Sequence, residues 1–216
     1  MEFRIFNFGL VDFKKAWQFQ KEIFKEIKND YFNAALILCR HYPVITVGRQ
    51  GSQENIKVSV PELKNRGIQL YEVERGGDVT YHGPGQLIAY PVFNLNYFKK
   101  DIHLFLRQLE ELIIDLLSDF GINGLRYKGL TGVWIDKQKI ASIGIAIRNW
   151  ITFHGLSINV KKDDLDNFSL IKPCGMDIEM TSLESVLNRG VEMDNIKNNL
   201  IQKFRESYED EKTHNL

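Results

Sequence analysis

The chain has 216 residues, of which 44% are hydrophobic and 26% charged, which is typical of a globular protein with a substantial core. Basic and acidic residues number 28 each, so no excess of one charge favours nucleic acid or an anionic membrane as a partner. The sequence shows no signal-peptide pattern and no apolar run of membrane-spanning length, so we expect a cytoplasmic protein. Its two cysteines, Cys39 and Cys174, are then expected to be free thiols, and no Cys/His cluster predicts a metal site.

Hydrophobic periodicity predicts a mixture of helices and strands in the first half of the chain. A helix is expected from Phe13 to Lys28 with Asp12 as its N-cap, because apolar residues recur at the helical period after this aspartate. Further along, the pattern predicts strands from Ala34 to Cys39, from Val44 to Val47 and from Ile68 to Glu74, and a short helix after Ser59.

The second half predicts one long amphipathic helix and a strand-rich region. Asp101 is expected to cap the helix, whose core face begins at Ile102, and Gly121 to end it. The other predicted elements are strands from Leu87 to Leu95, Gly132 to Asp136, Lys139 to Arg148 and Ile151 to Val160, a short helix with a Thr181/Glu184 capping box, and a last helix capped by Asp194. The absence of a regular βαβ rhythm favours an α+β class, with residues 1–216 as one domain built on a mixed sheet flanked by helices.

Residues 75–86 (RGGDVTYHGPGQ) combine four glycines and a proline with polar side chains. Glycine lets the backbone approach a ligand closely, so the run could form a binding loop lined with amide donors. It lacks the spacing of a Walker or dinucleotide loop, and an ordinary surface turn is about as good a reading of the run alone. A bracing role is the simplest expectation for His82 within it and for His154 farther on.

Two residues have the chemical character of a nucleophile and its activator. Cys174 stands between Pro173 and Gly175, an uncrowded and stiffened position that suits a reactive thiol. Lys139 opens an apolar strand, where a solvated edge residue is the usual finding, but an ammonium facing a cleft would lower the pKa of a nearby thiol. Cys39, at the end of an apolar strand, is expected to be a small buried hydrophobe.

Four separate segments together resemble the lipoyl(octanoyl) transferases, a family in the biotin/lipoate protein ligase-like superfamily. The matching segments, in family order, are residues 75–86, residues 139–144 (KIASIG), residues 153–159 (FHGLSIN) and residues 173–176 (PCGM). The resemblance extends over residues 41–187 and implies the α+β fold of the biotin and lipoate ligase catalytic domains.

By this resemblance, Cys174 matches the acyl-thioester nucleophile and Lys139 the lysine that lowers its pKa. Three stretches match the family's acyl substrate site: Arg75, Gly76, Gly77, Asp78, Val79, Thr80, Tyr81 and His82; Ser142, Ile143 and Gly144; and Gly155, Leu156 and Ser157. Backbone amides of the glycine-rich segments are expected to act as oxyanion donors.

The resemblance also implies the partners. Octanoyl-acyl carrier protein is the expected donor, with the acyl group on its phosphopantetheine, and the enzyme is expected to need no cofactor of its own. The expected acceptors are lipoyl domains of 2-oxoacid dehydrogenase complexes and the glycine cleavage H protein, with no nucleic acid or membrane partner. Because such partners are usually acidic, a local basic rim is expected from Arg75, Lys128, Arg148 and Lys172.

Other readings stay open at this point. An ATP-dependent lipoate or biotin ligase shares the fold and a central lysine but needs no cysteine. A cysteine-dependent amidotransferase that moves octanoyl or lipoyl groups between proteins would differ in its donor. An inactive acyl-binding or lipoyl-domain-binding module fits less well, because such a module needs neither Cys174 nor Lys139.

Overall fold

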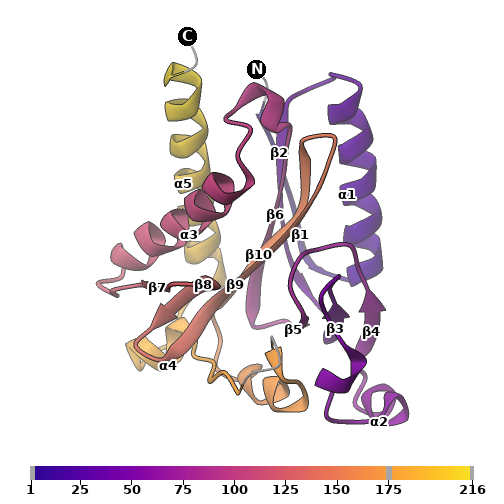
Figure 1. The fold of residues 1–216 in the computed structure, drawn as a ribbon. Helices are drawn as coiled ribbons and strands as arrows, with labels where there is room; N and C mark the ends of the chain where they lie inside the picture. The colour runs from indigo at the N-terminus through magenta and orange to yellow at the C-terminus, as the bar shows by residue number, and fades with distance from the viewer. Residues whose placement is uncertain (1–2, 174–176, 215–216) are drawn as a thin grey trace.

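A seven-stranded mixed sheet forms the frame of the molecule in a computed structural model that describes residues 3–173 and 177–214 (Figure 1). The outer strand β1 runs parallel to β2, and every other neighbouring pair is antiparallel. The strands lie in the order β1 (Phe3–Val11), β2 (Ala34–His41), β6 (Gln86–Phe93), β10 (Ile151–Asn159), β9 (Gln138–Arg148), β8 (Leu130–Ile135) and β7 (Leu125–Tyr127).

The central strands are apolar throughout because both faces of the sheet are covered. Successive side chains of a strand point to opposite faces, so one continuous apolar run supplies two separate cores. In β2, one face carries Ala34, Leu36 and Leu38, and the other carries Ala35, Ile37 and Cys39. Cys39 is a buried free thiol, as its sequence context predicted, and burial raises its pKa well above the ordinary value.

Helices pack on the two faces of this sheet, one on the first face and two on the second (Figure 1). Helix α1 (Phe13–Lys28) covers the face with Cys39, while α3 (Ile102–Ser118) and α5 (Met193–His214) pack together on the other. The predicted caps of α1 and α3 are confirmed: Asp12 accepts from the backbone N–H of Lys14 at 2.9 Å, and Asp101 from that of Leu104 at 3.0 Å.

A smaller three-stranded sheet lies beside the large one, in the order β4 (Gln69–Glu72), β3 (Val44–Val47) and β5 (Val79–His82). Its core includes residues of two short segments, α2 (Val60–Asn65) and the 3-10 helix η3 (Leu165–Leu170). Two more 3-10 helices are present, η1 (Gln53–Asn55) and η2 (Leu95–Tyr97). Together the two sheets confirm the α+β class.

Several local expectations were wrong. The glycine-rich run at 75–86 is only partly a loop, because β5 forms inside it and pairs with β3. Helix α4 (Leu183–Leu187) is capped by Ser182, whose hydroxyl accepts from the Ser185 N–H at 3.2 Å, rather than by Thr181. Asp194 lies inside the first turn of α5 and does not precede it.

Two further differences concern the edges of the predicted elements. The outer strand β1 was not predicted, because residues 7–10 at its far end are exposed and its pairing with β2 is set by tertiary contact. The expected core residue Ile102 is 39% exposed at the start of α3. Within the described residues, no helix has the length and apolar character needed to cross a membrane.

Strand β10 bends where it leaves β6. His154 has a φ of 57°, a left-handed conformation that is rare outside glycine. Its N–H donates to the side-chain oxygen of Gln20 on α1 at 2.8 Å, so α1 holds this bend from outside the sheet. The next residue, Gly155, lies against β6 so closely that a Cβ there would be 2.2 Å from the Ala89 carbonyl oxygen. The bend therefore requires a residue without a side chain at position 155.

We expect Gly155→Ala to destabilise the protein by about 1–3 kcal/mol, because the added carbon forces the backbones of β6 and β10 apart. The free energy of unfolding in urea would measure this. Gly190→Ala is the matched control, since a Cβ at that exposed site meets no atom within 4 Å. Equal unfolding midpoints for the two variants would contradict the close approach of β10 to β6.

Candidate active site

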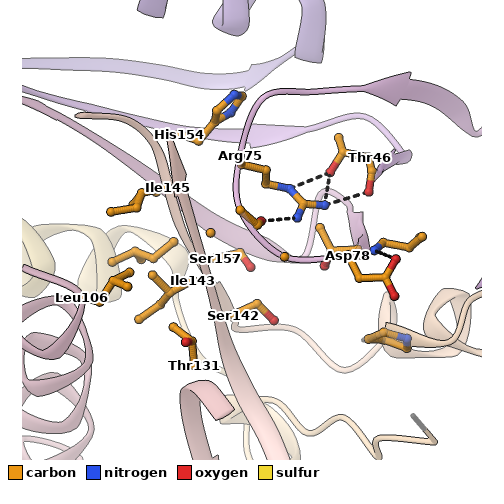
Figure 2. Close-up of a pocket in the computed structure, with 18 of the residues that line it drawn as sticks. Thr46, Arg75, Asp78, Leu106, Thr131, Ser142, Ile143, Ile145, His154 and Ser157 are labelled. Atoms are coloured by element: carbon orange, nitrogen blue, oxygen red, sulfur yellow. Dashed lines mark hydrogen bonds between the residues drawn. The ribbon is translucent and has the colours of Figure 1, made fainter. Parts of the chain in front are cut away.

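A cavity of about 490 Å³ lies between the small sheet and strands β9 and β10 of the large one. Figure 2 shows Leu106, Ile143 and Ile145 on one side of it and Arg75, Thr46 and Asp78 on the other. The first group is apolar and the second polar, so the cavity has two chemically different walls. Its size falls in the usual range for small-molecule sites.

Most residues singled out from the sequence meet at this cavity, although they come from distant parts of the chain. Those that line it are Arg75, Gly76, Gly77, Asp78, Val79, Thr80, His82, Lys139, Ser142, Ile143, Gly144, Gly155, Leu156 and Ser157. The structure therefore brings three separate sequence segments and Lys139 to one surface.

Tyr81 does not line the cavity. Neighbouring residues of β5 point to opposite sides, and Tyr81 points into the core of the small sheet. There its ring packs edge-on against Phe168, with centroids 5.5 Å apart, and its hydroxyl accepts from the side-chain amide of Asn167 at 2.9 Å. Its place in the glycine-rich run is explained by packing.

Arg75 lies inside the protein, at 8% exposure, so it is not part of an exposed rim. Its guanidinium donates to the carbonyl oxygen of Thr46 at 2.8 Å and to the Thr46 hydroxyl at 2.9 Å. It also donates to the carbonyl oxygen of Gly76 at 3.0 Å. These bonds tie the start of the glycine-rich run to β3 and fix the polar wall of the cavity.

Asp78 joins the same run to the segment that precedes Cys174. One carboxylate oxygen accepts from the N–H of Val79 at 2.7 Å, and the other from the Asn55 side-chain amide at 2.5 Å. The backbone oxygen of Asn55 in turn accepts from the N–H of Lys172 at 2.8 Å. Asp78 therefore helps to fix the backbone of this region.

Lys139 is only 7% exposed, so the reading of it as a solvated edge residue is wrong. Its ammonium donates to the carbonyl oxygen of Thr131 at 3.0 Å and lies 4.7 Å from the centre of the Trp134 ring. A hydrogen bond and the negative face of an aromatic ring both favour the charged form of a buried amine. The cavity wall thus contains a cation that strand β8 holds in place.

The backbone of Lys139 holds the chain that follows Cys174. Its N–H donates to the carbonyl oxygen of Glu179 at 2.8 Å, and its own carbonyl oxygen accepts from the N–H of Thr181 at 3.0 Å. Cys174 itself lies outside the described residues. Among the described residues near it, Pro173 and Ile178 both line the cavity, so the chain reaches the cavity wall before and after this segment.

Three histidines are buried near the polar wall. His41 donates to the carbonyl oxygen of Val11 at 3.0 Å and accepts from the Tyr90 hydroxyl at 2.7 Å. His82 donates to the side-chain oxygen of Gln86 at 3.0 Å. Burial lowers the pKa of His41 to about 4 and that of His82 to about 3, so both are neutral near pH 7.

His154 is also neutral near pH 7, because burial lowers its pKa. Its contact with Glu74 at 3.4 Å is therefore a hydrogen bond from a neutral ring, not an ion pair. That bond lowers the pKa of Glu74 to about 2. All three histidines brace the site, as expected for His82 and His154, and none supplies a charge to it at neutral pH.

The glycine-rich run offers fewer free amides than expected. The Gly76 N–H donates to the carbonyl oxygen of Ile145 at 2.8 Å, and the Gly77 N–H to the side-chain oxygen of Gln50 at 3.2 Å. The Gly85 N–H donates to Asp164. These three bonds shape the loop, so the expected oxyanion donors are not these amides.

Several cavity residues were not predicted from the sequence. They lie on elements that read as ordinary core, and they are Phe13, Thr46, Tyr90, Ile102, Leu106, Leu130, Thr131 and Trp134. One signal was available for Thr46, a hydroxyl in the otherwise apolar strand VITV. No local signal marks Thr131, whose backbone oxygen accepts the hydrogen bond from Lys139.

Comparison with known proteins identifies relatives over nearly the whole chain. The profile of the lipoyl protein ligase A/B catalytic domain matches residues 12–205. An octanoyltransferase of Thermoanaerobacter sp. (strain X514) is 42% identical over 207 residues, covering 94% of this chain and 89% of that protein. The octanoyltransferase of Caldicellulosiruptor saccharolyticus is 44% identical over 199 residues, covering 91% and 84%.

Solved structures show the same fold at lower identity. A crystal structure of lipoate-protein ligase A bound with ATP has a TM-score of 0.78 at 19% identity, covering 97% of this chain and 86% of that one. Biotin protein ligase from Aquifex aeolicus has a TM-score of 0.55 at 11% identity, covering 97% and 71%. Likeness at these identities establishes the lipoate and biotin ligase architecture.

The buried histidines predict that acid weakens the fold well before the carboxylates titrate. Unfolded histidines take up protons near pH 6.5, whereas His41 and His82 do so in the folded state only near pH 4 and 3. The unfolded state binds more protons between these values, so stability is lost as the pH falls below about 6.5. From pH 7 to 5.5 we expect a loss of about 1 kcal/mol for each of His41 and His82.

Urea unfolding at the two pH values measures this loss. His103→Gln, which removes an exposed histidine on α3, is the control. A free energy of unfolding that stays constant from pH 7 to 5.5 would show that the histidines are not buried in the neutral form.

Proposed function

This chain belongs to the lipoyl protein ligase A/B catalytic domain family, and on that premise we propose that it is an octanoyltransferase that works through a thioester on Cys174. The relatives of this name, at 42% and 44% identity, cover more than nine tenths of the chain. Octanoyl transfer in protein lipoylation is the activity that these relatives support.

One structural observation favours the thioester route in particular. The ammonium of Lys139 is buried at the cavity wall, and the backbone of the same residue pairs with Met180, six residues after Cys174. A positive charge near a cysteine favours its thiolate, which is the reactive form. Lys139 would supply this charge to Cys174, because the chain around Cys174 reaches the same cavity at Pro173 and Ile178.

The proposed reaction has two steps. In the first, the Cys174 thiolate attacks the carbonyl carbon of an octanoyl thioester, and the carbon–sulfur bond to phosphopantetheine breaks. The departing pantetheine sulfur takes a proton from Lys139. This step leaves an octanoyl-enzyme and a neutral Lys139 amine.

In the second step, the neutral side-chain amine of a lipoyl-domain lysine attacks the Cys174 thioester. The amide bond forms, the Cys174 thiolate leaves, and Lys139 takes the proton lost by the attacking nitrogen. The enzyme returns to its starting charges, so one cavity serves a donor and an acceptor in turn. No nucleotide, metal or other cofactor enters this scheme.

The apolar wall of the cavity suits a short acyl chain. Leu106, Leu130, Ile143 and Ile145 line it, and each buried methylene contributes about 0.8 kcal/mol. The hydrocarbon part of an octanoyl group would then gain roughly 5 kcal/mol on binding. On the polar wall, Arg75 already donates to the carbonyl oxygen and the hydroxyl of Thr46.

The acceptors of this family are lipoyl domains, and a bipartite lipoate protein ligase of Thermoplasma acidophilum has been described with its E2 lipoyl domain. For this chain, octanoyl-acyl carrier protein is the proposed donor. The proposed acceptors are the lipoyl domains of 2-oxoacid dehydrogenases and the glycine cleavage H protein. Of the suggested basic rim, Lys128, Arg148 and Lys172 are exposed and could meet an acidic partner. A reducing cytoplasm would keep Cys174 available.

The fold also allows the ATP-dependent alternative, because a lipoate-protein ligase bound with ATP has the same architecture. That reaction activates a free acid and needs no thiol. The higher identity to octanoyltransferases favours thioester transfer. Product formed from free octanoate only with Mg-ATP would favour the ligase instead.

We expect the protein to gain the mass of one octanoyl group when it is incubated with octanoyl-acyl carrier protein in the absence of ATP. Adding a lipoyl domain should remove the adduct and acylate the domain. Intact mass spectrometry follows both changes. Cys174→Ala should show no adduct and no transfer, whereas Cys39→Ala should retain both, because Cys39 is buried in the core. Full transfer by Cys174→Ala would rule out the thioester.

We also expect Lys139→Ala to raise the pKa of the Cys174 thiol by about one unit or more, since a neighbouring positive charge is lost. The rate of iodoacetamide alkylation as a function of pH reports this pKa. The measurement is made in Cys39→Ala, where Cys174 is the single thiol. An identical midpoint with and without the lysine would mean that Lys139 does not activate Cys174.

A further inference from the structure

A buried carboxylate on α3 has no part in the reaction as proposed above. The side chain of Glu110 is 1% exposed and accepts two hydrogen bonds. One comes from the backbone N–H of Gly132 at 3.0 Å and the other from Arg107 at 2.5 Å. Arg126 forms an ion pair with the same carboxylate, with its Nε 3.2 Å from Oε2. The carboxylate is thus fully paired, and one of its donors is the backbone of β8.

That backbone donor belongs to the peptide unit that contacts Lys139. The carbonyl of Thr131 and the N–H of Gly132 are the two polar groups of one planar unit, and in a trans peptide they point in opposite directions. Glu110 accepts from the N–H on one side, and the Lys139 ammonium donates to the carbonyl oxygen at 3.0 Å on the other. Fixing one bond therefore fixes the direction of the other.

The side chain of Lys139 lies along this same peptide unit, because Gly132 has no side chain in the way. Its φ of 131° is a conformation that favours glycine. A Cβ at this position would be 2.6 Å from Cε of Lys139 and 3.2 Å from its Nζ. The lysine side chain therefore crosses directly over the peptide that Glu110 holds.

We propose that Glu110 is a positioning residue for Lys139, acting through the Thr131–Gly132 peptide. It orients the Thr131 carbonyl so that the ammonium stays at the cavity wall, where Cys174 reacts. The role in catalysis rests on the function proposed above. The geometric link between Glu110 and Lys139 does not.

Removing the acceptor need not unfold the protein. Arg107 is 51% exposed and Arg126 32% exposed, so both guanidiniums can turn to water. Arg126 also keeps its bonds to Glu111 and to the carbonyl oxygen of Arg107. Removing one partner of a buried ion pair is costly when the other charge stays buried, and here both guanidiniums can reach water. Glu110→Met is therefore a usable variant.

The experiment measures alkylation of Cys174 by iodoacetamide against pH in the Cys39→Ala protein. We expect Glu110→Met to slow the reaction at pH 7 roughly tenfold, as a rise of about one pKa unit implies. Glu110→Gln keeps an acceptor oxygen for Gly132 and should retain most of the rate. Glu111→Met is the matched control. It removes a carboxylate from the adjacent residue, which is exposed and also forms an ion pair with Arg126.

A merely structural role would give a different pattern. Loss of lysine position shifts the midpoint of the pH profile and leaves the high-pH plateau unchanged, whereas damage to the site lowers the plateau. In a Lys139→Ala background, Glu110→Met should cause no further shift. The proposal is overturned if the shift is the same in both backgrounds, if Glu111→Met gives an equal shift, or if Glu110→Met leaves the midpoint where it was.

The alkylation experiment can be interpreted without the proposed function. Alkylation needs no octanoyl donor, so coupling between Glu110 and Lys139 can be measured even if no octanoyl adduct forms. An adduct without coupling would refute the positioning role alone. Coupling without an adduct would refute the thioester route and keep the link.

Discussion

The backbone pairing of Lys139 is the constraint on which the candidate site depends. This residue lies near the start of β9, where it pairs with β8 on one side and with the chain at Met180 on the other. Its backbone therefore cannot move without disturbing the two stretches of chain paired with it. The cavity, the cation and the segment after Cys174 are fixed relative to one another by the same few hydrogen bonds.

Several polar groups at or behind the cavity wall are paired within the protein. Arg75 is bound to Thr46, Asp78 to Asn55, and Glu110 to Gly132. Buried polar groups without partners would cost several kcal/mol each and would also compete for a ligand. Because these groups are already paired, few polar groups at the cavity wall are left to take part in a reaction. The histidines follow the same rule, since burial keeps them neutral.

The sequence allowed most of the helices to be predicted, because these depend on local signals, whereas the candidate site residues came from the resemblance of four segments to a known family. Asp12 and Asp101 cap their helices as expected, since an N-cap needs only the next three residues. The same reasoning misplaced the cap of α4 by one position, because Thr181 and Ser182 are both good caps and the tertiary bond from Thr181 to Lys139 decides between them. The short strand β5 was hidden by the glycines around it.

What could not be predicted is which atoms the site residues contact. In the sequence, Arg75 looks like a surface charge. Only the fold shows that its guanidinium donates a hydrogen bond to Thr46, 29 positions earlier. Glu110 reads as one of two adjacent acids on a helix, and its partner Gly132 lies 22 residues away. Contacts of this range depend on how the sheets meet, which no window of sequence contains.

At Lys139, the main chain has a structural role and the side chain has the proposed chemical role. Main-chain atoms of this residue fix the segment after Cys174, while its side chain alone enters the proposed chemistry. Side chains at such a position are free to be exchanged during evolution, because the frame persists when the reactive group is replaced. An architecture of this kind is suited to changing its reaction while keeping its shape, and an engineer could replace the chemistry without first redesigning the scaffold.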